Sequence, residues 1–300
     1  FTSMKVYTDP EDSQLVADAK KNEELEEFDY SYTERDVILY NLGIGATEQE
    51  LQFTFENDER FAALPTFGVI PQFAAFGGFD FVPDFNPAKL LHGEQYLAIK
   101  APIPTSGDLV STSRIMEVLD KGKAAAVTTI IETREKRSGT LIFENQSTVF
   151  IRGSGGFGGK RNGSDRGPAS AANDPPKRQP DAIVEEKTSP SQAALYRLSG
   201  DLNPLHILPE FAAIGGFDKP ILHGLCSFGI AGKHVLRTYG AYSDIKVRFA
   251  GVVYPGETLI TQMWKEGNKV IFNVKVKERD AIVLAAAAVT LVEDAAKAKL

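Results

Sequence analysis

The sequence has a single cysteine, Cys226, and only four histidines in 300 residues. One cysteine cannot form an internal disulfide, so nothing in the sequence requires an oxidising compartment. The histidines are scattered, and no Cys/His cluster has the spacing of metal ligands, so we expect no bound metal. No apolar run approaches the roughly 20 residues of a membrane-spanning helix, so we expect no membrane span.

Positive charge is also scarce. The 33 lysines and arginines are outnumbered by 40 aspartates and glutamates, which gives a formal net charge of −7. This balance argues against a sequence-independent binder of nucleic acid or of anionic membranes, but it leaves room for a local basic pocket that holds an anionic ligand. Apolar residues make up 43% and charged residues 24%, as in soluble globular proteins, and the length suffices for two domains.

Residues 153–180 differ in composition from the rest of the chain. Glycine, proline, serine and charged residues dominate this segment, which is typical of a linker. It begins with GSGGFG, a match to the G-x-G-x-x-G pattern of dinucleotide sites, but the sequence KRNG and the prolines after it cannot open the helix that such a site needs. We therefore predict two halves, residues 1–152 and 181–300, joined by a linker over residues 153–180.

The two halves resemble each other in sequence. VILYNLGIGA (37–46) is similar to AALYRLSGDL (193–202), LPTFGVI (64–70) to LCSFGIA (225–231), and PTSGDLVSTS (104–113) to VYPGETLITQ (253–262). In the second half, an apolar face predicts a helix over 225–239 that Gly240 ends. Alternating or apolar runs then predict strands over 245–249, 258–264, 269–277 and 281–292. We expect an α+β fold in which a sheet wraps around a long helix in each half.

The copies differ at one polar turn. The second copy continues with Asp201, Asn203 and His206, where the first has only glycine, isoleucine and alanine. Pro204 restricts the backbone of the turn, so the three side chains point in a narrow range of directions. Asp and His on one turn can share a water and exchange its protons. Alternatively, Asp201 is a helix cap, Asn203 forms an Asx turn and His206 is a buried structural histidine.

Gly224 precedes the long helix of the second half. Its N–H lies at a helix N-terminus, where free amide donors and the helix dipole favour developing negative charge. This arrangement is that of an oxyanion hole, although a glycine in this position is also a common N-cap. Cys226 follows two residues later, and we interpret it as a small buried hydrophobe.

The stretch YRLSGDLNPLH (196–206), with Ala212 downstream, matches the signature of the hydratase 2 family, the (R)-specific 2-enoyl-CoA hydratases. The stretches LPTFGVI, AKLLHGEQY, GSGGFGGKR, GFDKPILHGLC and VYPGETL extend this resemblance over nearly the whole chain. The chain is similar to the hydratase 2 unit of peroxisomal multifunctional enzymes of type 2.

The resemblance implies a double hot-dog fold, with two antiparallel sheets each wrapped around a long central helix. It also implies syn hydration of trans-2-enoyl-CoA to (3R)-3-hydroxyacyl-CoA in fatty-acid β-oxidation, without a cofactor. Asp201 and His206 would hold the water that attacks C3 while C2 is protonated, and Asn203 would support them. The Gly224 N–H would stabilise the thioester enolate oxygen. The first half, which lacks the turn, would accommodate a long acyl tail.

The resemblance further implies which residues contact the acyl-CoA substrate. Glu56 corresponds to a glutamate that the family needs for activity, although a structural role for it is equally consistent with the sequence. The residues implied in substrate contacts are His92, Gly93, Lys121, Asp201, Leu202, Asn203, Pro204, Leu205, His206, Gly224 and Phe249.

The resemblance also suggests a homodimer that is fused to, or works with, a (3R)-hydroxyacyl-CoA dehydrogenase domain. The chain begins without methionine, which suggests a piece of a larger polypeptide. It ends in Ala298-Lys299-Leu300, a conservative variant of the Ser-Lys-Leu peroxisomal signal, so we expect a peroxisomal location with no further domain after it.

Two other functions stay open at this point. A hot-dog thioesterase would use Asp201 to activate water at the carbonyl, and it would release free thiol. A non-catalytic acyl-CoA-binding module would bind without turnover, but it would not need the polar turn. The paired acid–base groups of that turn favour attack of water at C3.

Overall fold

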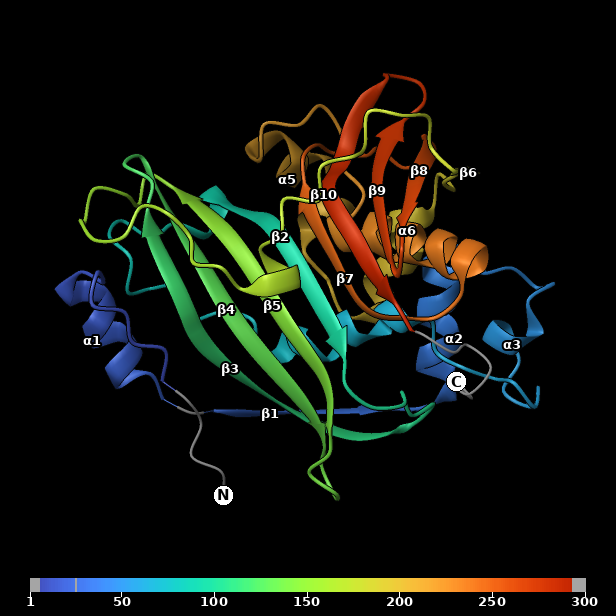
Figure 1. Cartoon of the computed structure of the whole chain (residues 1–300), viewed down its shortest axis with the longest axis horizontal. Helices are drawn as coiled ribbons and strands as arrows, with labels where there is room; N and C mark the ends of the chain where they lie inside the picture. Colours follow the sequence, from blue (N-terminus) through green and yellow to red (C-terminus); the bar gives the residue numbers. More distant parts are fainter. Residues whose placement is uncertain (1–5, 25, 293–300) are drawn as a thin grey trace.

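The computed structural model describes residues 6–24 and 26–292. Within them, ten strands form one antiparallel sheet in the spatial order β1-β3-β4-β5-β2-β7-β10-β9-β8-β6 (Figure 1). The strands are β1 (Glu27–Tyr32), β2 (Leu90–Ile99), β3 (Gly107–Asp120), β4 (Ala124–Glu135), β5 (Leu141–Arg152), β6 (Ala182–Lys187), β7 (Tyr242–Phe249), β8 (Thr258–Glu266), β9 (Lys269–Val276) and β10 (Ala281–Leu291).

The longest helix of the described residues is α6, which is buried along most of its length. Two of its glycines allow close packing on the first half. A Cβ at Gly229 would lie 2.6 Å from Cγ2 of Ile44, and one at Gly232 would lie 2.7 Å from Cγ2 of Thr66. The helices are α1 (Gln14–Asn22), α2 (Glu34–Gly43), α3 (Leu51–Thr54), α4 (Gln192–Tyr196), α5 (Pro209–Ile214) and α6 (Gly224–Tyr239).

The strand order is symmetric about the pair β2·β7 at the centre of the sheet. From the centre outwards, β2, β5, β4, β3 and β1 on one side match β7, β10, β9, β8 and β6 on the other. The central pair runs from Glu94 opposite Arg248 to Ala98 opposite Asp244. Two similar β-rich repeats produce this order when they pair edge to edge, and the α+β class predicted from the sequence is confirmed.

The structure differs from the prediction in two details. The strands form one continuous sheet and not two, and the first half has no counterpart of α6 among its described residues. The segment similar to the start of α6 forms two 3₁₀ turns, η1 (Pro65–Val69) and η2 (Pro71–Ala75). Each turn begins at a proline, and Pro71 cannot donate a helical hydrogen bond to the preceding turn, so an α-helix does not continue through this segment.

A buried lysine on α6 forms an ion pair within the second half and a hydrogen bond to the first half. The fully buried Lys233 ammonium donates to the carboxylate of Glu186 at 2.8 Å and to the carbonyl oxygen of Gly45 at 2.7 Å. His234 lies between the same carboxylate and the hydroxyl of Thr261. The charges are therefore compensated within the protein, as burial of an ammonium group requires.

Residues 153–180 cross the sheet on the face opposite α6 (Figure 1). Ile245 and Val247 of β7 face the core, whereas Lys246 between them points the other way and donates to the carbonyl oxygen of Ala171 at 3.0 Å. In the GSGGFG stretch, the N–H groups of Gly156 and Gly158 donate to the Asp120 carboxylate at 2.8 and 2.7 Å. These N–H groups therefore hold an internal carboxylate.

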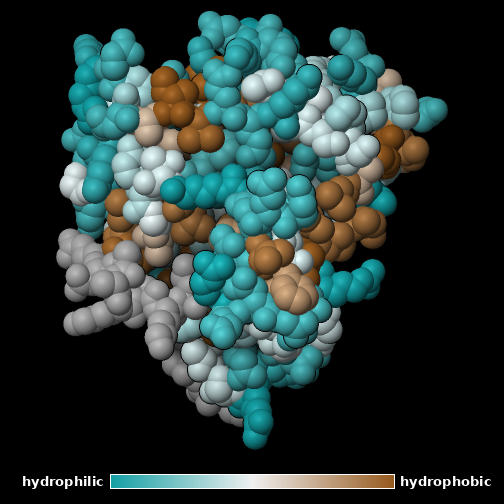
Figure 2. Space-filling model, turned by 90° about the vertical axis from the view of Figure 1, so that its right-hand side faces the viewer, coloured by the Kyte–Doolittle hydropathy of each residue, from teal (hydrophilic) through white to brown (hydrophobic). Residues whose placement is uncertain are grey.

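One face of the molecule shows how polar and apolar residues are distributed over the surface. Figure 2 shows a face that is mostly hydrophilic, with separate hydrophobic patches. Among the residues that the structure describes, no helix has both the length and the apolar character needed to span a membrane.

Candidate active site

A cavity of about 390 Å³ lies where the two halves meet. The first half contributes η2 and the start of β2, and the second half contributes the polar turn, the start of α6 and the end of β7. The lining residues are Gln72, Phe73, Phe76, Leu90, Leu91, His92, Asp201, Asn203, Leu205, His206, Phe217, Ile221, Leu222, Gly224, Leu225, Ser227, Phe249, Gly251, Val252, Val253, Val283 and Leu284.

The polar turn is held by its own side chains. Gly200 precedes it with a φ of +142°, which L side chains rarely adopt. The Asp201 carboxylate accepts from the Asn203 N–H at 3.2 Å, and the Asn203 side-chain oxygen accepts from the Leu205 N–H at 3.0 Å. Asn203 thereby caps the short 3₁₀ turn η6 (Pro204–His206). This cap fixes the backbone position from which the His206 side chain extends.

His206 is buried, and its hydrogen bond identifies the tautomer. Its Nδ1 donates to the carbonyl oxygen of Ile221 at 2.8 Å, so the lone pair of a neutral ring is on Nε2. Burial lowers the pKa of His206, although the Ile221 carbonyl and the Asp201 carboxylate oppose this shift. Near neutral pH the ring is therefore an uncharged base at the wall of the cavity.

Gly224 is the first residue of α6, and its N–H has no acceptor within the described part of the chain. A side chain at this position would crowd the cavity wall, since a Cβ would lie 3.0 Å from the ring atoms Cδ1 and Cε1 of Phe249. The glycine therefore lets an aromatic ring and a free helix N–H lie side by side.

His223 joins this group, although the sequence did not single it out. It is 1% exposed, its Nε2 donates to the main-chain oxygen of Asp201 at 3.1 Å, and its ring stacks on His206 with 3.7 Å between centroids. Burial lowers the pKa of His223 to about 3, and the neighbouring His206 contributes to this shift. It is therefore neutral at any pH at which the protein is expected to act.

Potential metal ligands of Asp201, His206 and His223 lie within 4.8 Å of one another. The prediction of no metal rested on the spacing of histidines along the sequence, which cannot reveal this cluster. That prediction therefore stays a prediction. The His206 ring and the Asp201 carboxylate also form an arrangement that can hold a water and move its protons.

Of the other residues expected to contact substrate, His92 and Phe249 line the cavity. Their rings lie 4.7 Å apart, and the His92 Nε2 is buried without a hydrogen-bond partner among the residues that the structure describes. Burial lowers the pKa of His92 to about 4. Gly93 lies behind it, where a Cβ would be 2.5 Å from the ring of Phe150, so this glycine permits close packing of β2 on β5.

Lys121 and Glu56 do not line this cavity. The Lys121 ammonium donates to the carbonyl oxygen of Arg161 at 2.5 Å and lines a separate hollow. Glu56 is exposed after α3, where its carboxylate is 3.5 Å from the side-chain nitrogen of Asn57. Leu202 and Pro204 belong to the polar turn but do not line the cavity, and Leu202 is 59% exposed.

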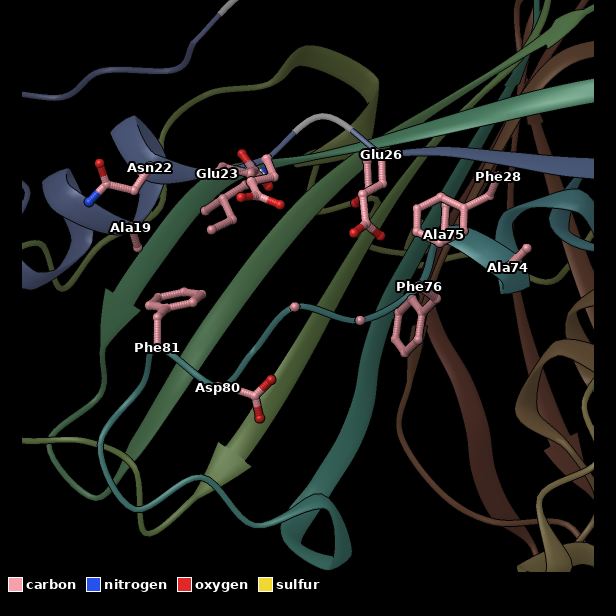
Figure 3. Close-up of a pocket in the computed structure, with 15 residues that line it drawn as sticks. Ala19, Asn22, Glu23, Glu26, Phe28, Ala74, Ala75, Phe76, Asp80 and Phe81 are labelled. Atoms are coloured by element: carbon pink, nitrogen blue, oxygen red, sulfur yellow. Dashed lines mark hydrogen bonds between the residues drawn. The ribbon is translucent and has the colours of Figure 1, made fainter.

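A second cavity of about 540 Å³ lies in the first half, beside α1 and β1 (Figure 3). Phe76 lines both cavities, so the two spaces meet at this residue. Figure 3 shows Phe76 next to Ala75 at one end of the second cavity, with Phe81 and the carboxylates of Glu26 and Asp80 around the rest.

Comparison with known proteins decides the family. Residues 30–153 match the MFE-2 hydratase 2 N-terminal domain, and residues 171–287 match the MaoC like domain. A curated relative, enoyl-CoA hydratase 2, peroxisomal, of Arabidopsis thaliana, is 42% identical over 302 residues, covering 91% of this chain and 95% of its own. The chain belongs to the enoyl-CoA hydratase 2 family.

This hydratase 2 chain also resembles longer proteins. It is 57% identical over 267 residues to the peroxisomal hydratase-dehydrogenase-epimerase of Neurospora crassa, covering 88% of this chain but 30% of that protein. The chain thus spans about a third of the length of the first curated relatives that it matches.

Solved structures agree with the fold of the hydratase 2 chain. A MaoC-like dehydratase from Phytophthora capsici superposes with a TM-score of 0.83 at 38% identity, covering 92% of this chain and 97% of its own. A Mycobacterium tuberculosis protein described as a double hotdog fold superposes over 91% of this chain and 96% of its own, with a TM-score of 0.56 at 11% identity. The predicted double hot-dog fold is confirmed.

Proposed function

We propose that this chain hydrates trans-2-enoyl-CoA to (3R)-3-hydroxyacyl-CoA in peroxisomal fatty-acid β-oxidation. The observation that carries the proposal is the meeting of Asp201, the neutral His206 and the free Gly224 N–H at one cavity. Relatives named enoyl-CoA hydratase 2 support the substrate class and the reaction.

The start of α6 activates the thioester. Its first N–H, from Gly224, donates to the thioester oxygen, and the positive end of the helix dipole favours the charge that builds up there. This withdraws electrons from the conjugated C2=C3 bond, so C3 becomes electrophilic and the intermediate enolate is stabilised.

Asp201 and His206 supply the water and its protons. The Nε2 lone pair of His206 and the Asp201 carboxylate accept hydrogen bonds from one water molecule. The water oxygen bonds to C3 and gives one proton to Asp201, which then delivers a proton to C2 as the enolate collapses. The product gains one O–H at C3 and one hydrogen at C2, and both side chains return to their starting protonation states. Delivery from one side gives syn addition.

The first half receives the acyl tail in this proposal. Phe76 lines both the catalytic cavity and the cavity of about 540 Å³ in the first half. Movement of this ring would join the two spaces, so the tail of a long substrate would pass it while C3 stays at Asp201.

We also propose that the chain works as a homodimer beside a (3R)-hydroxyacyl-CoA dehydrogenase activity. The name of the Neurospora crassa relative joins hydratase and dehydrogenase, and several relatives are named peroxisomal. The expected signal Ala298-Lys299-Leu300 lies outside the described residues. Sedimentation of the purified chain would test the dimer.

The first test compares the wild type with Asp201→Asn on a medium-chain trans-2-enoyl-CoA. We expect loss of the conjugated-enoyl absorbance without release of thiol, an R product, and a fall in kcat of at least about 100-fold in the variant. Thiol release would instead favour the thioesterase, and saturable binding by a folded wild type without turnover would leave only a binding module.

A further inference from the structure

His223 contacts three parts of the candidate site without a place in the proposed chemistry. We propose that His223 is a positioning residue, which fixes the distance between the water-holding pair Asp201/His206 and the Gly224 N–H. This inference rests on the hydration function proposed above.

The first contact fixes Asp201. A carbonyl oxygen only accepts, so the Nε2 of His223 carries the hydrogen and donates to the main-chain oxygen of Asp201 at 3.1 Å. This bond joins residues that are 22 positions apart in the sequence. Within residues 6–24 and 26–292, the Asp201 and Asn203 side chains bond only within the turn, and the His206 ring bonds to Ile221, so the His223 contact is the one that ties the Asp201 backbone to the start of α6.

The second contact fixes the plane of the His206 ring. The two rings stack with 3.7 Å between centroids and 28° between planes, and Tyr196 packs against His223 at 4.9 Å. The hydrogen bond from Nδ1 of His206 to Ile221 holds one edge of the ring. The ring could still rotate about this bond, so a second contact is needed to fix its plane. The stack supplies it and directs Nε2 into the cavity.

The third contact fixes the start of α6. The main-chain oxygen of His223 accepts from the N–H groups of Cys226 and Ser227 at 3.0 and 3.3 Å. The helix therefore begins at Gly224, whose own N–H stays free for the substrate. One residue thus holds the carboxylate turn, the base and the oxyanion donor in a common frame.

The second ring nitrogen of His223 indicates that this residue positions other groups and does not transfer protons itself. Its Nδ1 is buried and has no hydrogen-bond partner in the described part of the chain, so it faces no proton donor. The ring acts through its Nε2–H and its flat face, and two substitutions separate these contacts. His223→Gln keeps a donor at the position of Nε2 and loses the stack, whereas His223→Phe keeps the stack and loses the donor.

The test measures kcat, KM and the pH profile of kcat/KM for both variants. We expect His223→Phe to lower kcat by about 10- to 100-fold with little change in KM, because the reacting groups are displaced while the binding surface stays. We expect His223→Gln to lower kcat less than His223→Phe does, because it keeps the donor to Asp201 and loses only the stack that holds the His206 ring. The acid limb of the kcat/KM profile of His223→Gln should move to higher pH. Water then reaches the His206 ring and solvates its protonated form better, which raises the pKa of His206.

Among the described residues, the ionisable groups around the stacked His206 and His223 rings are Asp201 on the turn, Arg197 before the turn, and His92 on β2 at the cavity wall, and His223 itself immediately precedes α6. Only His223 changes between the variants, so a shift of the acid limb reports the lost stack. Cys226→Ala is the matched control. It lies one helical turn from His223, and it should keep both kcat and the pH profile.

Unchanged kcat and an unchanged pH profile in folded His223 variants would overturn the inference, provided that the wild type hydrates the substrate. A wild type without hydratase activity would refute the proposed function instead. If His223→Phe does not fold, the acid limb of His223→Gln decides, because a purely structural histidine would leave it in place.

Discussion

Acid should unfold this protein at a pH well above that at which carboxylates titrate. All four histidines are held neutral inside the folded chain: burial lowers the pKa of His92 to about 4 and that of His223 to about 3, and the pKa values of His206 and His234 are also lowered. In the unfolded chain each histidine has a pKa of about 6.5. The unfolded state therefore binds protons first as the pH falls.

The sign and size of the effect follow from this difference. Above about pH 6.5 neither state is protonated at these rings, and stability does not depend on them. Below it, each ring lowers the free energy of unfolding by up to about 1.4 kcal/mol per pH unit until its folded pKa is reached. At about pH 5, His92 and His223 together cost about 4 kcal/mol, and the other two add to this loss. The total free energy of unfolding of a domain is only about 5–15 kcal/mol.

Urea denaturation between about pH 7.5 and pH 5 measures this loss directly. The matched variant is His92→Phe, which removes one titrating ring and keeps an aromatic contact with Phe249. Between these pH values it should lose about 2 kcal/mol less than the wild type, because carboxylates contribute equally to both proteins. If both proteins lose the same amount, His92 is not held neutral by the fold and the reasoning is refuted.

Three further measurements test other parts of the structure. Gly139→Ala, at a φ of +71° with nothing within 4 Å, should cost about 1–2 kcal/mol in denaturant unfolding, whereas Gly45→Ala, at +85°, should cost several kcal/mol because its Cβ would lie 2.2 Å from the Glu186 carboxylate. Equal costs would show that the ion pair moves aside freely. Phe76→Ala should raise kcat/KM for long acyl chains relative to short ones, and an unchanged ratio would place the tail elsewhere. Lys121→Ala should raise KM several-fold with kcat kept if this lysine contacts the CoA moiety, and an unchanged KM would remove it from the substrate site.

Local signals in the sequence predicted the parts of the fold that local physics determines. The helix expected over 225–239 is α6, and Gly240 ends it as predicted. The strand runs of the second half match β7 to β10 within a few residues, because alternation reports burial directly. The polar turn could be predicted for a similar reason, since Pro204 and the neighbouring Asx side chains act over only five residues.

Contacts between distant segments could not be predicted in this way. His223 precedes a helix and has no pattern of its own, and its importance depends on the fold bringing it against His206. Similarity between the halves also misled the prediction for residues 64–70, where Pro65 and Pro71 favour 3₁₀ turns over the helix of the second copy. At these residues the prolines predict the local structure better than the similarity between the two halves does.

The pairing of β2 with β7 has a consequence for how this chain can be divided. A cut within residues 153–180 would leave each half with a bare central strand, and five residues of each would lose their cross-strand partners. Such open edges are templates for uncontrolled strand addition and aggregation. The first copy therefore covers the central edge of the second, even though its own turn lacks the polar groups. For the two central strands to stay covered, both repeats must be joined in one polypeptide or must pair soon after they are made.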